Sequence, residues 1–404
     1  MNLKDAAANL NQAHPEDILH PLYTLWGESL VRSGSYDDIL PEYPRPQMKR
    51  TDYHMLNGLW EYAFVPADGS SSSEDSAYFT AQGSIRVPFS PEALLSGVHR
   101  RLEPTEYLWY HRELSFSTEE LSQKEENMRC ILHFDAVDQE ATVFLGTKKL
   151  GTHSGGYLPF SLDITEYVNA DPVSLYVKVR DLTDSGYATR GKQTLNRGGM
   201  FYTAQSGIWQ TVWLERVPEN YIDTLTVTPD YDARTVTVKV HTSKPGGAVN
   251  LWAVVRAGGV TIAEDWGSDE ADRDGVVTLH ISEEHFFPWS PDSPFLYDLT
   301  VGTTQGEEEQ RDTVHSYFAL RKWSCAPDAH GIMRFCLNGR PILLNGLLDQ
   351  GYWPDGLYTP PSDAAVEHEL HTVRELGFNL LRKHAKIEPE RWYYHCDRLG
   401  MIVW

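Results

Sequence analysis

A loop of carboxylate, amide and aromatic side chains near the end of the chain offers the first candidate chemistry. Asp349 and Gln350 follow a short apolar run, and Tyr352 and Trp353 come directly after them. The faces of Trp and Tyr rings pack on the apolar faces of sugar rings, and an Asp carboxylate accepts hydrogen bonds from hydroxyl groups. This combination suits a neutral polar ligand such as a sugar. The alternative is a loop that packs on a neighbouring domain and binds nothing.

A second polar group follows the next apolar run. Arg382, Lys383 and His384 come directly after FNLL. Because His384 stands at a strand end before a loop, a place in the wall of a site is favoured over one in the core. For Arg382 an internal ion pair is an equal alternative, and Lys383 is expected to face the opposite way. Trp404, at the end of a third apolar run, suits a pocket wall and a core position equally well.

The elements that must position these residues are alternating strands and helices. Strands are predicted at three apolar runs, residues 341–345, 378–381 and 401–404. Helices are predicted between them, at residues 365–376 and 388–399. Ser362 provides an N-cap for the first helix, and Gly377 and Gly400 provide stops. The order of these elements predicts a parallel α/β unit within residues 323–404.

The chain before this unit has the pattern of β-structure. Residues 1–50 predict an arm laid over a domain surface, because prolines interrupt any regular element there. Residues 51–218 alternate short strands with turn residues at a spacing of roughly 8 to 12 positions, which predicts an antiparallel sandwich or jelly roll. Residues 219–322 have the strand density of an immunoglobulin-like sandwich, without cysteines for an inter-sheet disulfide.

Composition and charge disfavour several classes of function. The 404 residues carry a formal net charge of −22, so phosphate would repel the chain, and neither a nucleic acid nor an anionic membrane is expected as a partner. The 4 cysteines form no Cys-x-x-Cys pair, which leaves no zinc knuckle or disulfide framework. No His-Glu-x-x-His or phosphate-loop motif occurs, so we expect no metal and no cofactor. Without an apolar leader or a run of about 18 apolar residues, we expect a cytoplasmic protein with no membrane span.

Several motifs in a fixed order carry a family resemblance. They are LNGLWEYAF (56–64), VPFSPEALLSG (87–97), YLWYHREL (107–114), HFDAVDQEATVFLG (133–146), LGTHSGGYLPFSLDIT (150–165), SGIWQTVWLERV (206–217), FPWSPDSPFLYDLTV (287–301), FCLNGRPILLNGLLDQGYWPDGLYTP (335–360) and CDRLGMIVW (396–404). Over residues from about 55 to 404, the chain resembles the N-terminal portion of glycoside hydrolase family 2, which includes β-galactosidases, β-glucuronidases and β-mannosidases. The resemblance implies a mainly β multidomain fold: a jelly-roll sugar-binding domain, an immunoglobulin-like sandwich and an incomplete (β/α)8 barrel of which only the first strands are present. It also implies β-glycosides as ligands.

The resemblance gives the polar residues expected roles. Barrel enzymes bind substrates at the C-terminal ends of the strands, and relatives place an Arg, and often a His, after the second strand. The predicted substrate contacts are Asp349, Gln350, Tyr352, Trp353, Arg382, His384, Asp184 and Trp404. In the galactosidase pattern the His stands three residues after the Arg and precedes Tyr-Pro. Here His384 stands two residues after Arg382 and precedes Ala385 and Lys386, which puts β-galactosidase specificity in doubt.

Asp184 enters this set because relatives send a loop from the jelly roll into the barrel mouth. The alternative is an Asp that caps its own turn. The spacer that follows contains Arg190, Lys192 and Arg197, which either approach an acidic sugar or lie in solvent.

The catalytic carboxylates of the family are missing from these residues. A retaining glycosidase uses two carboxyl groups about 5–5.5 Å apart. The family places one in an Asn-Glu pair after the fourth barrel strand and the other near the seventh. This sequence contains no Asn-Glu and stops in the third predicted strand. We therefore predict that the chain by itself does not hydrolyse glycosides.

Two alternatives to a piece of an enzyme stay open: a non-catalytic carbohydrate-binding module, and a protein-interaction module. Because barrel strands are apolar on both faces, residues 323–404 are expected to aggregate or to pair with another copy, as in a homo-oligomer. Neither the sugar nor the linkage is defined by the sequence.

Overall fold

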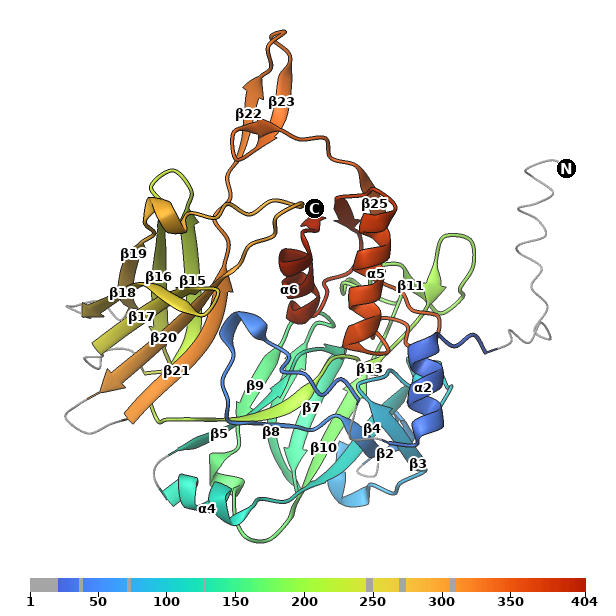
Figure 1. Ribbon diagram of the computed structural model, residues 1–404. Coiled ribbons are helices and arrows are strands. Elements are labelled where there is room, and N and C mark those ends of the chain that lie inside the picture. The colour runs from blue at the N-terminus through green and yellow to red at the C-terminus, as the bar shows by residue number, and fades with distance from the viewer. Residues whose placement is uncertain are drawn as a thin grey trace, which may run out of the picture.

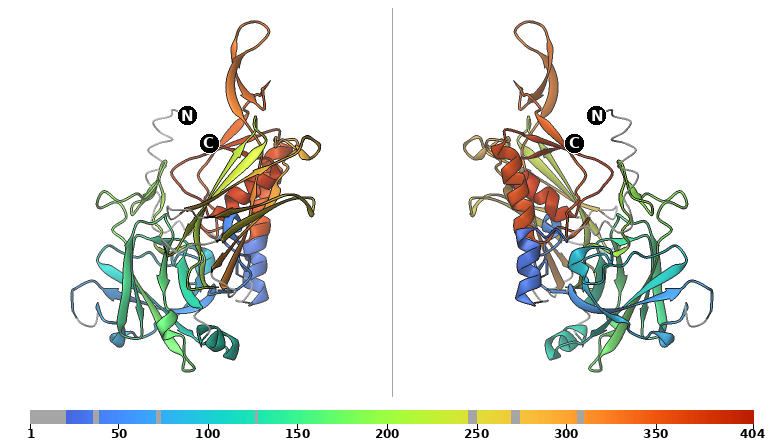
Figure 2. Two further views of the ribbon diagram at one scale, coloured as in Figure 1. Left: turned by 90° about the vertical axis from the view of Figure 1, so that its left-hand side faces the viewer. Right: turned by 90° about the vertical axis from the view of Figure 1, so that its right-hand side faces the viewer.

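The computed structural model of the chain describes residues 21–35, 39–70, 74–125, 128–244, 250–268, 274–305 and 310–404. The first part of the expected arm, residues 1–20, lies outside the described residues. The structure is mainly β, with two antiparallel sandwiches, a projecting hairpin and a small unit of parallel strands and helices (Figure 1, Figure 2). None of the helices in the described ranges is long and apolar enough to cross a membrane.

The first sandwich pairs a sheet of six strands with a sheet of four. The six-stranded sheet has the order β3 (Gly83–Val87), β2 (Gly58–Pro66), β4 (Glu106–Leu114), β10 (Val173–Arg180), β7 (Glu140–Leu145) and β8 (Lys148–Ser154). The four-stranded sheet has the order β1 (Tyr53–Met55), β14 (Val212–Val217), β5 (Arg129–Phe134) and β9 (Phe160–Asp163). All pairings in both sheets are antiparallel.

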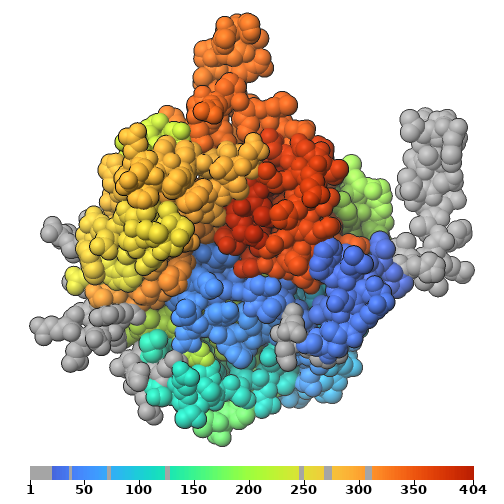
Figure 3. Space-filling model, viewed as in Figure 1, coloured from blue at the N-terminus to red at the C-terminus, as the bar shows by residue number. Residues whose placement is uncertain are grey.

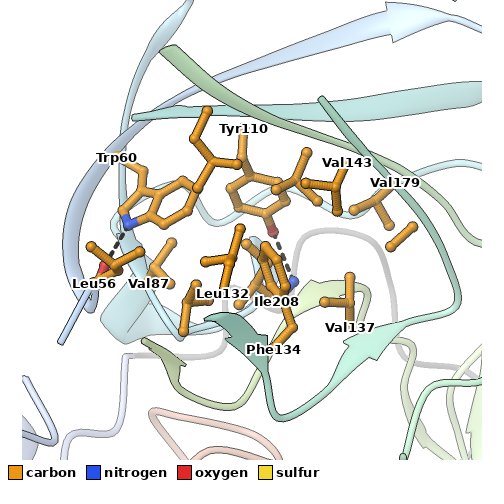
Figure 4. Packing of buried hydrophobic residues seen from close by; sticks show 14 of the residues in the cluster. Leu56, Trp60, Val87, Tyr110, Leu132, Phe134, Val137, Val143, Val179 and Ile208 are labelled. Carbon is orange, nitrogen blue, oxygen red and sulfur yellow. Dashed lines mark hydrogen bonds between the residues drawn. The ribbon is translucent and has the colours of Figure 1, made fainter. Parts of the chain in front are cut away.

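The core between these sheets follows from the period of two in the strands, because successive side chains of a strand face opposite ways. The inward residues of β10 are Leu175, Val177 and Val179. Two aromatic side chains carry polar atoms into this core, and both find partners (Figure 4). The Trp60 indole donates to the carbonyl of Leu56 at 2.7 Å, and the Tyr110 hydroxyl accepts from the amide of Ile208 at 3.2 Å.

Shorter elements connect the strands of this part. Two-residue strands form two further pairs, β6 (Val137–Asp138) with β13 (Gly207–Ile208) and β11 (Gln193–Thr194) with β12 (Tyr202–Thr203). The helical elements are α2 (Leu25–Ser33), α4 (Thr118–Glu125), η1 (Pro46–Met48), η2 (Ser76–Tyr78), η3 (Leu94–Ser96) and η4 (Thr165–Tyr167).

The second sandwich is smaller and has a core of its own. One sheet contains β15 (Ile222–Asp230), β16 (Thr235–Thr242) and β19 (Asp274–His280). The other contains β18 (Val260–Ser268), β17 (Asn250–Ala257), β20 (Tyr297–Gln305) and β21 (Gln310–Phe318). The single turn η5 (Glu283–His285) lies between β19 and β20.

The last part of the chain contains an antiparallel hairpin unit and a parallel sheet. The hairpin unit projects from the molecule in all views and contains β22 (Trp323–Pro327), β23 (Met333–Leu337) and β24 (Arg340–Pro341). The parallel sheet contains β25 (Gly346–Asp349), β26 (Leu380–Lys383) and β27 (Ile402–Val403), connected through α5 (Asp363–Glu375) and α6 (Glu390–Leu399). The predicted alternation of parallel strands and helices is therefore confirmed, and both helices lie within two residues of their predicted bounds.

The first predicted strand is wrong in position. The apolar run at 341–345 predicts a strand, but the parallel strand β25 begins at Gly346. Ile342 and Leu344 instead pack on a cluster that joins Trp289 of the second sandwich to Leu380 and Ile402 of the parallel sheet. The apolar run thus packs between two parts of the molecule, a role that local hydrophobicity does not distinguish from that of a barrel strand.

The second predicted strand is displaced by two residues. The run at 378–381 predicts its position, but β26 begins at Leu380. The two residues before β26 that the sequence predicts as strand follow the C-terminal cap of α5. Gly377 has φ 88°, and the amide of Phe378 donates to the carbonyl of Val373 at 3.2 Å. A helix that ends this way takes up two residues after its last turn.

A buried cluster of charged side chains, Arg50, Glu215 and Asp312, joins the arm to both sandwiches; we call it the hub. Arg50 of the arm donates to Glu215 on β14 at 3.0 Å and to both oxygens of Asp312 on β21, at 2.9 and 2.7 Å. Burial by itself would raise the pKa of Glu215, but the neighbouring His133 and arginines lower it to about 2. Figure 3 shows the arm in blue at the seam where both sandwiches and the α/β unit meet. The predicted arm therefore fastens the domains together.

Candidate functional site

Helices cover one face of the parallel sheet, and the other, here called the open face, is covered only in part, where Leu380 and Ile402 pack in a cluster with Trp289. Helices α5 and α6 pack on the covered face through a cluster that includes Leu370, Leu381 and Trp392. On the open face the side chain of Trp404 is 77% exposed, and the guanidinium of Arg382 lies 6.0 Å from its ring centroid. Arg382 is exposed and makes no ion pair within the described part of the chain. Two of the predicted contacts thus lie together on the open face.

A buried network of charges lies beneath the C-terminal ends of these strands. Lys383 pairs with Asp349 at 2.6 Å and with Glu388, and Lys386 pairs with Glu388 at 2.9 Å. Burial lowers the pKa of Lys386, whereas for Lys383 the two carboxylates outweigh the effect of burial and raise the pKa. Because each buried charge has an opposite partner, the network can fix the loops after β25 and β26.

Asp349 is held within this network on both sides. One oxygen accepts from Lys383, and the other accepts from the amide of Gly351 at 2.7 Å. Lys386 also donates to the carbonyls of Gly351 and Tyr358, each at 2.7 Å. Lys383 faces the helices and Arg382 faces the opposite way, as the period of two requires.

A projecting segment of the first sandwich, residues 184–206, reaches this end of the parallel sheet. We call it the lobe; it appears in light green beside α5 in Figure 1. Asp184 closes its base by accepting from the Thr194 hydroxyl at 2.7 Å and from the Leu195 amide at 3.3 Å. The hydrogen bond from Thr194 is the main cause that lowers the pKa of Asp184.

The lobe contacts both strand-end loops. The ring of Tyr202 stacks on Tyr352, with centroids 3.9 Å apart and planes 15° from parallel. Gly191 has φ +58°, and a Cβ added there would lie 2.4 Å from the carbonyl oxygen of Ala385. Only glycine allows this close approach of two backbones. Two parts of the chain that are distant in the sequence therefore form one surface.

Three polar atoms at this surface lack protein partners. They are Oε1 of Gln350, the hydroxyl of Tyr352 and Nδ1 of His384, all buried and without a hydrogen bond among the described residues. Burial raises the pKa of Tyr352, so its hydroxyl stays protonated. Because unpaired buried polar atoms cost free energy, ligand hydroxyls that bind here would satisfy them.

The predicted site residues fall into three groups. Tyr352 contacts the lobe directly, and Gln350 and His384 lie in the two strand-end loops that the lobe contacts. Arg382 and Trp404 lie on the open face. Asp349, Trp353 and Asp184 are held by other groups of the protein: Asp349 by Lys383, Asp184 by Thr194, and Trp353 by a backbone bridge with Leu357 and by packing on the covered face.

Sequence reasoning missed the residues that bring the loops together. These are Tyr157, Gly191, Tyr202, Tyr358, Lys386 and Glu388. The only local signal was an aromatic pair in the glycine-rich segment GGMFYT. The carboxylates and lysines of the network carry no motif.

One group of acids and a histidine among the described residues is close enough to hold a metal ion: Asp363, Glu367 and His395. These donors already have other partners. Arg391 binds both oxygens of Asp363, each at 2.6 Å, and Arg398 pairs with Glu367. The group is satisfied as an ionic cluster between α5 and α6, so we assign no metal to it.

Comparisons with known proteins agree on one family. Residues 95–218 match the model of "Glycosyl hydrolases family 2, sugar binding domain", and residues 220–321 match that of "Glycosyl hydrolases family 2". A putative β-glucuronidase of Formosa agariphila is 26% identical over 73% of this chain and 34% of its own length. A β-galactosidase of Thermoanaerobacter pseudethanolicus is 22% identical over 86% of this chain and 46% of its own length. The chain thus spans less than half of these relatives.

Solved structures share the fold. A β-glucuronidase of Bifidobacterium dentium, in complex with coumarin-3-O-glucuronide, has a TM-score of 0.70 at 19% identity and covers 89% of this chain and 61% of its own. A Bacteroides uniformis β-glucuronidase has a TM-score of 0.67 at 21% identity and covers 87% and 41%.

Proposed function

Because the chain belongs to glycoside hydrolase family 2, we propose that it supplies the N-terminal part of a retaining β-glycosidase. In this proposal residues 1–50 are the arm, 51–218 the jelly-roll domain and 219–322 the immunoglobulin-like domain. Residues 323–404 supply the first strands of an incomplete (β/α)8 barrel. The order of β25, α5, β26, α6 and β27 supports the last assignment, because parallel strands with intervening helices are the repeating unit of that barrel.

One observation carries the position of the sugar site: the lobe meets the C-terminal ends of the parallel strands through Tyr202 and Tyr352. At the same place Gln350 and His384 hold unpaired polar atoms. Aromatic rings beside unpaired hydrogen-bonding groups suit a sugar, which presents an apolar ring face and a rim of hydroxyls. Arg382 and Trp404 would extend the wall along the open face.

The 404-residue chain by itself is proposed to be inactive in hydrolysis, because neither catalytic carboxylate of the family is present in it. A non-catalytic carbohydrate-binding module is the alternative, and the match of residues 95–218 to a sugar-binding domain model supports it. The two proposals differ in the coding sequence that they expect beyond codon 404 of the gene.

The test is to sequence the gene beyond codon 404 and to assay two proteins on p-nitrophenyl β-glycosides: the 404-residue chain and the product of the full reading frame. We expect the longer product to contain an Asn-Glu and a second Glu, and to hydrolyse a β-glycoside with retention of configuration. The 404-residue chain should show no turnover above the buffer. Turnover by the short chain would overturn its proposed inactivity, and a longer product without the two carboxylates would overturn the enzyme proposal.

A further inference from the structure

The lobe is basic although the chain is acidic. Residues 184–206 carry three cations, Arg190, Lys192 and Arg197, and one anion, Asp184, which gives the lobe a net charge of +2, whereas the whole chain has −22. None of the three cations forms an ion pair with another described residue. A local positive field in an acidic protein attracts anions to one place.

A hollow of about 660 Å³ lies between the lobe and the segment that contains residues 92–101 of the first sandwich. Three of its lining side chains are basic, His99, Arg101 and Arg197. Hydroxyl groups of Thr194 and Thr203 also line it. Its volume lies within the range of about 300–1,000 Å³ that is usual for sites of small ligands.

The cations of the hollow are held in place by the protein. Arg101 donates to Glu103 at 2.9 and 2.7 Å and to the carbonyl of Leu195 at 2.5 Å, which ties the two walls together. Arg197 donates through Nη1 to the Thr203 hydroxyl at 3.0 Å. The other guanidinium N–H groups of Arg197 have no partner among the described residues, and Arg197 is exposed. A guanidinium fixed at one nitrogen keeps donors for a planar anion such as a carboxylate.

The one acid in the hollow does not oppose an anion at neutral pH. Glu92 accepts from the amides of Leu102 and Ser206 and from the Ser206 hydroxyl, at 3.0, 3.1 and 2.8 Å. These bonds favour the ionised form, but burial outweighs them and raises the pKa of Glu92 to about 8. A largely neutral carboxyl group therefore forms part of the floor.

We propose that this hollow is an accessory binding site for an anionic saccharide, a sugar that bears a carboxylate or a sulfate group. Arg197 would bind the anionic group, and the threonine hydroxyls would bind the sugar hydroxyls. The same lobe carries Tyr202, so a chain bound here lies near the strand-end junction. The proposal goes beyond the proposed glycosidase function, because binding here requires no catalytic group.

Calorimetry on the 404-residue chain tests the site. The probes are trigalacturonate, a sulfated trisaccharide and a neutral trisaccharide, each at about 20 and 150 mM salt, because the Debye length shortens over this range. We expect at least one anionic trisaccharide to bind and the neutral one to bind at least tenfold more weakly. The tighter of the two anionic probes identifies the recognised group.

Two matched variants distinguish binding of the anionic probe in the hollow from non-specific electrostatic attraction to the protein. Arg197→Gln should raise the Kd of the anionic probe about tenfold, the loss expected for one charge-assisted hydrogen bond. Arg340→Gln removes an exposed arginine of β24 that also makes no ion pair with described residues, and it should leave the Kd unchanged. Near-ultraviolet circular dichroism verifies that both variants fold.

Three outcomes would overturn the proposal: no binding of either anionic probe, equal binding of the neutral probe, or equal weakening by the two variants. None of them bears on the glycosidase proposal, which the hydrolysis assay tests separately.

Discussion

Glu215 shows how much one buried side chain can hold together. It accepts from Arg50 and Arg45, at 3.0 and 3.1 Å, and from the Tyr43 hydroxyl at 2.7 Å. Asp312 of the second sandwich completes the hub through Arg50. Since the two arginines and the two carboxylates balance in charge, loss of the Glu215 carboxylate leaves Arg45 without its ion-pair partner and leaves Arg50 with Asp312 alone.

Glu215→Gln should lower the free energy of unfolding by about 3–5 kcal/mol, the usual cost of breaking a buried ion pair. The control is Glu219→Gln, since Glu219 pairs with Lys244 on the surface and exposed pairs of this kind contribute little to stability. Urea denaturation followed by tryptophan fluorescence measures both. Equal losses in the two variants would contradict a structural role for the hub.

Acids at the contact between the first sandwich and the helices predict a dependence on pH. Asp135 and Glu369 line a small cavity there, and burial raises the pKa of each to about 7. A carboxyl group whose pKa is higher in the folded state binds its proton more tightly when folded. Its contribution to stability is therefore complete below the unfolded pKa of about 4 and is lost as the pH rises through about 7.

Thermal unfolding between pH 5 and pH 8 tests this dependence. The Tm should fall across the range in the native chain, and Glu369→Gln should reduce the slope and raise the Tm at pH 8. Near Glu369, Asp349 and Glu388 oppose ionisation, while Lys383 and Lys386 favour it. Glu375→Gln, an exposed substitution on the same helix, is the control. A Tm that rises with pH, or an unchanged slope in Glu369→Gln, would refute the assignment.

At the scale of elements, the contact between the lobe and the parallel sheet depends on backbone geometry. Gly191 and Gly199 have nearly the same φ, +58° and +59°, but a Cβ would meet another atom only at Gly191. An alanine at either position would bear the same cost of a left-handed backbone, but only an alanine at 191 would also clash with another part of the chain.

Gly191→Ala should separate the lobe from Ala385 and loosen the Tyr202–Tyr352 stack. Hydrogen exchange in residues 350–358 and 384–386 should become at least tenfold faster, since these loops lose the lobe as a cover. Gly199→Ala should cost on the order of 1 kcal/mol of stability and leave that exchange unchanged. Equal exchange in both variants would mean that the lobe does not support the strand-end loops.

The arm acts between elements as well. Asp355, in the loop after β25, accepts from the amide and hydroxyl of Thr24 at 2.8 and 2.7 Å, ahead of the first turn of α2. Gly27 in that turn lies so close that a Cβ would be 2.0 Å from the Asp355 carboxylate. A carboxylate at a helix N-terminus is stabilised by the helix dipole. The arm thus holds the loop that carries Tyr352.

At the scale of the molecule, the open face of the parallel sheet leaves large apolar side chains exposed. Leu348 is 55% exposed and Trp404 77%. A hollow of about 600 Å³ beside them is lined by Trp289, Trp323 and Leu380, among others. Apolar surface of this kind favours association, which supports the prediction that residues 323–404 pair with another copy or aggregate.

Sedimentation velocity from about 1 to 50 µM should show association that grows with concentration, because mass action favours the associated state. Trp404→Ser should shift the chain toward monomer. Trp266→Ser, which removes a tryptophan that is 70% exposed on the second sandwich, should not. A monomer at all concentrations, with residues 323–404 protected from protease, would contradict this prediction.

The sequence by itself determined the local elements of this protein. The Ser362 hydroxyl accepts from the Ala365 amide at 3.1 Å as the predicted N-cap of α5, and Gly400 ends α6 with φ 78°. Caps and glycine stops act within a few residues, so their signals lie side by side in the chain. The period of two in β10 is local in the same way.

Only the tertiary structure decided the site. Ile342 and Leu344 of the apolar run at 341–345 pack on a cluster that includes Trp289, ahead of the parallel strand, and Tyr202 of the first sandwich meets Tyr352 in the loop after β25. The ion pair between Lys383 and Asp349 depends on the register of β25 against β26, which places the two residues opposite each other. These contacts join segments that are distant along the chain, and their free energy comes from packing and burial that no local pattern encodes. For this reason the sequence named Gln350, Tyr352 and His384, and the resemblance implied a loop near Asp184, but neither predicted the contact of Tyr202 with Tyr352 that joins them.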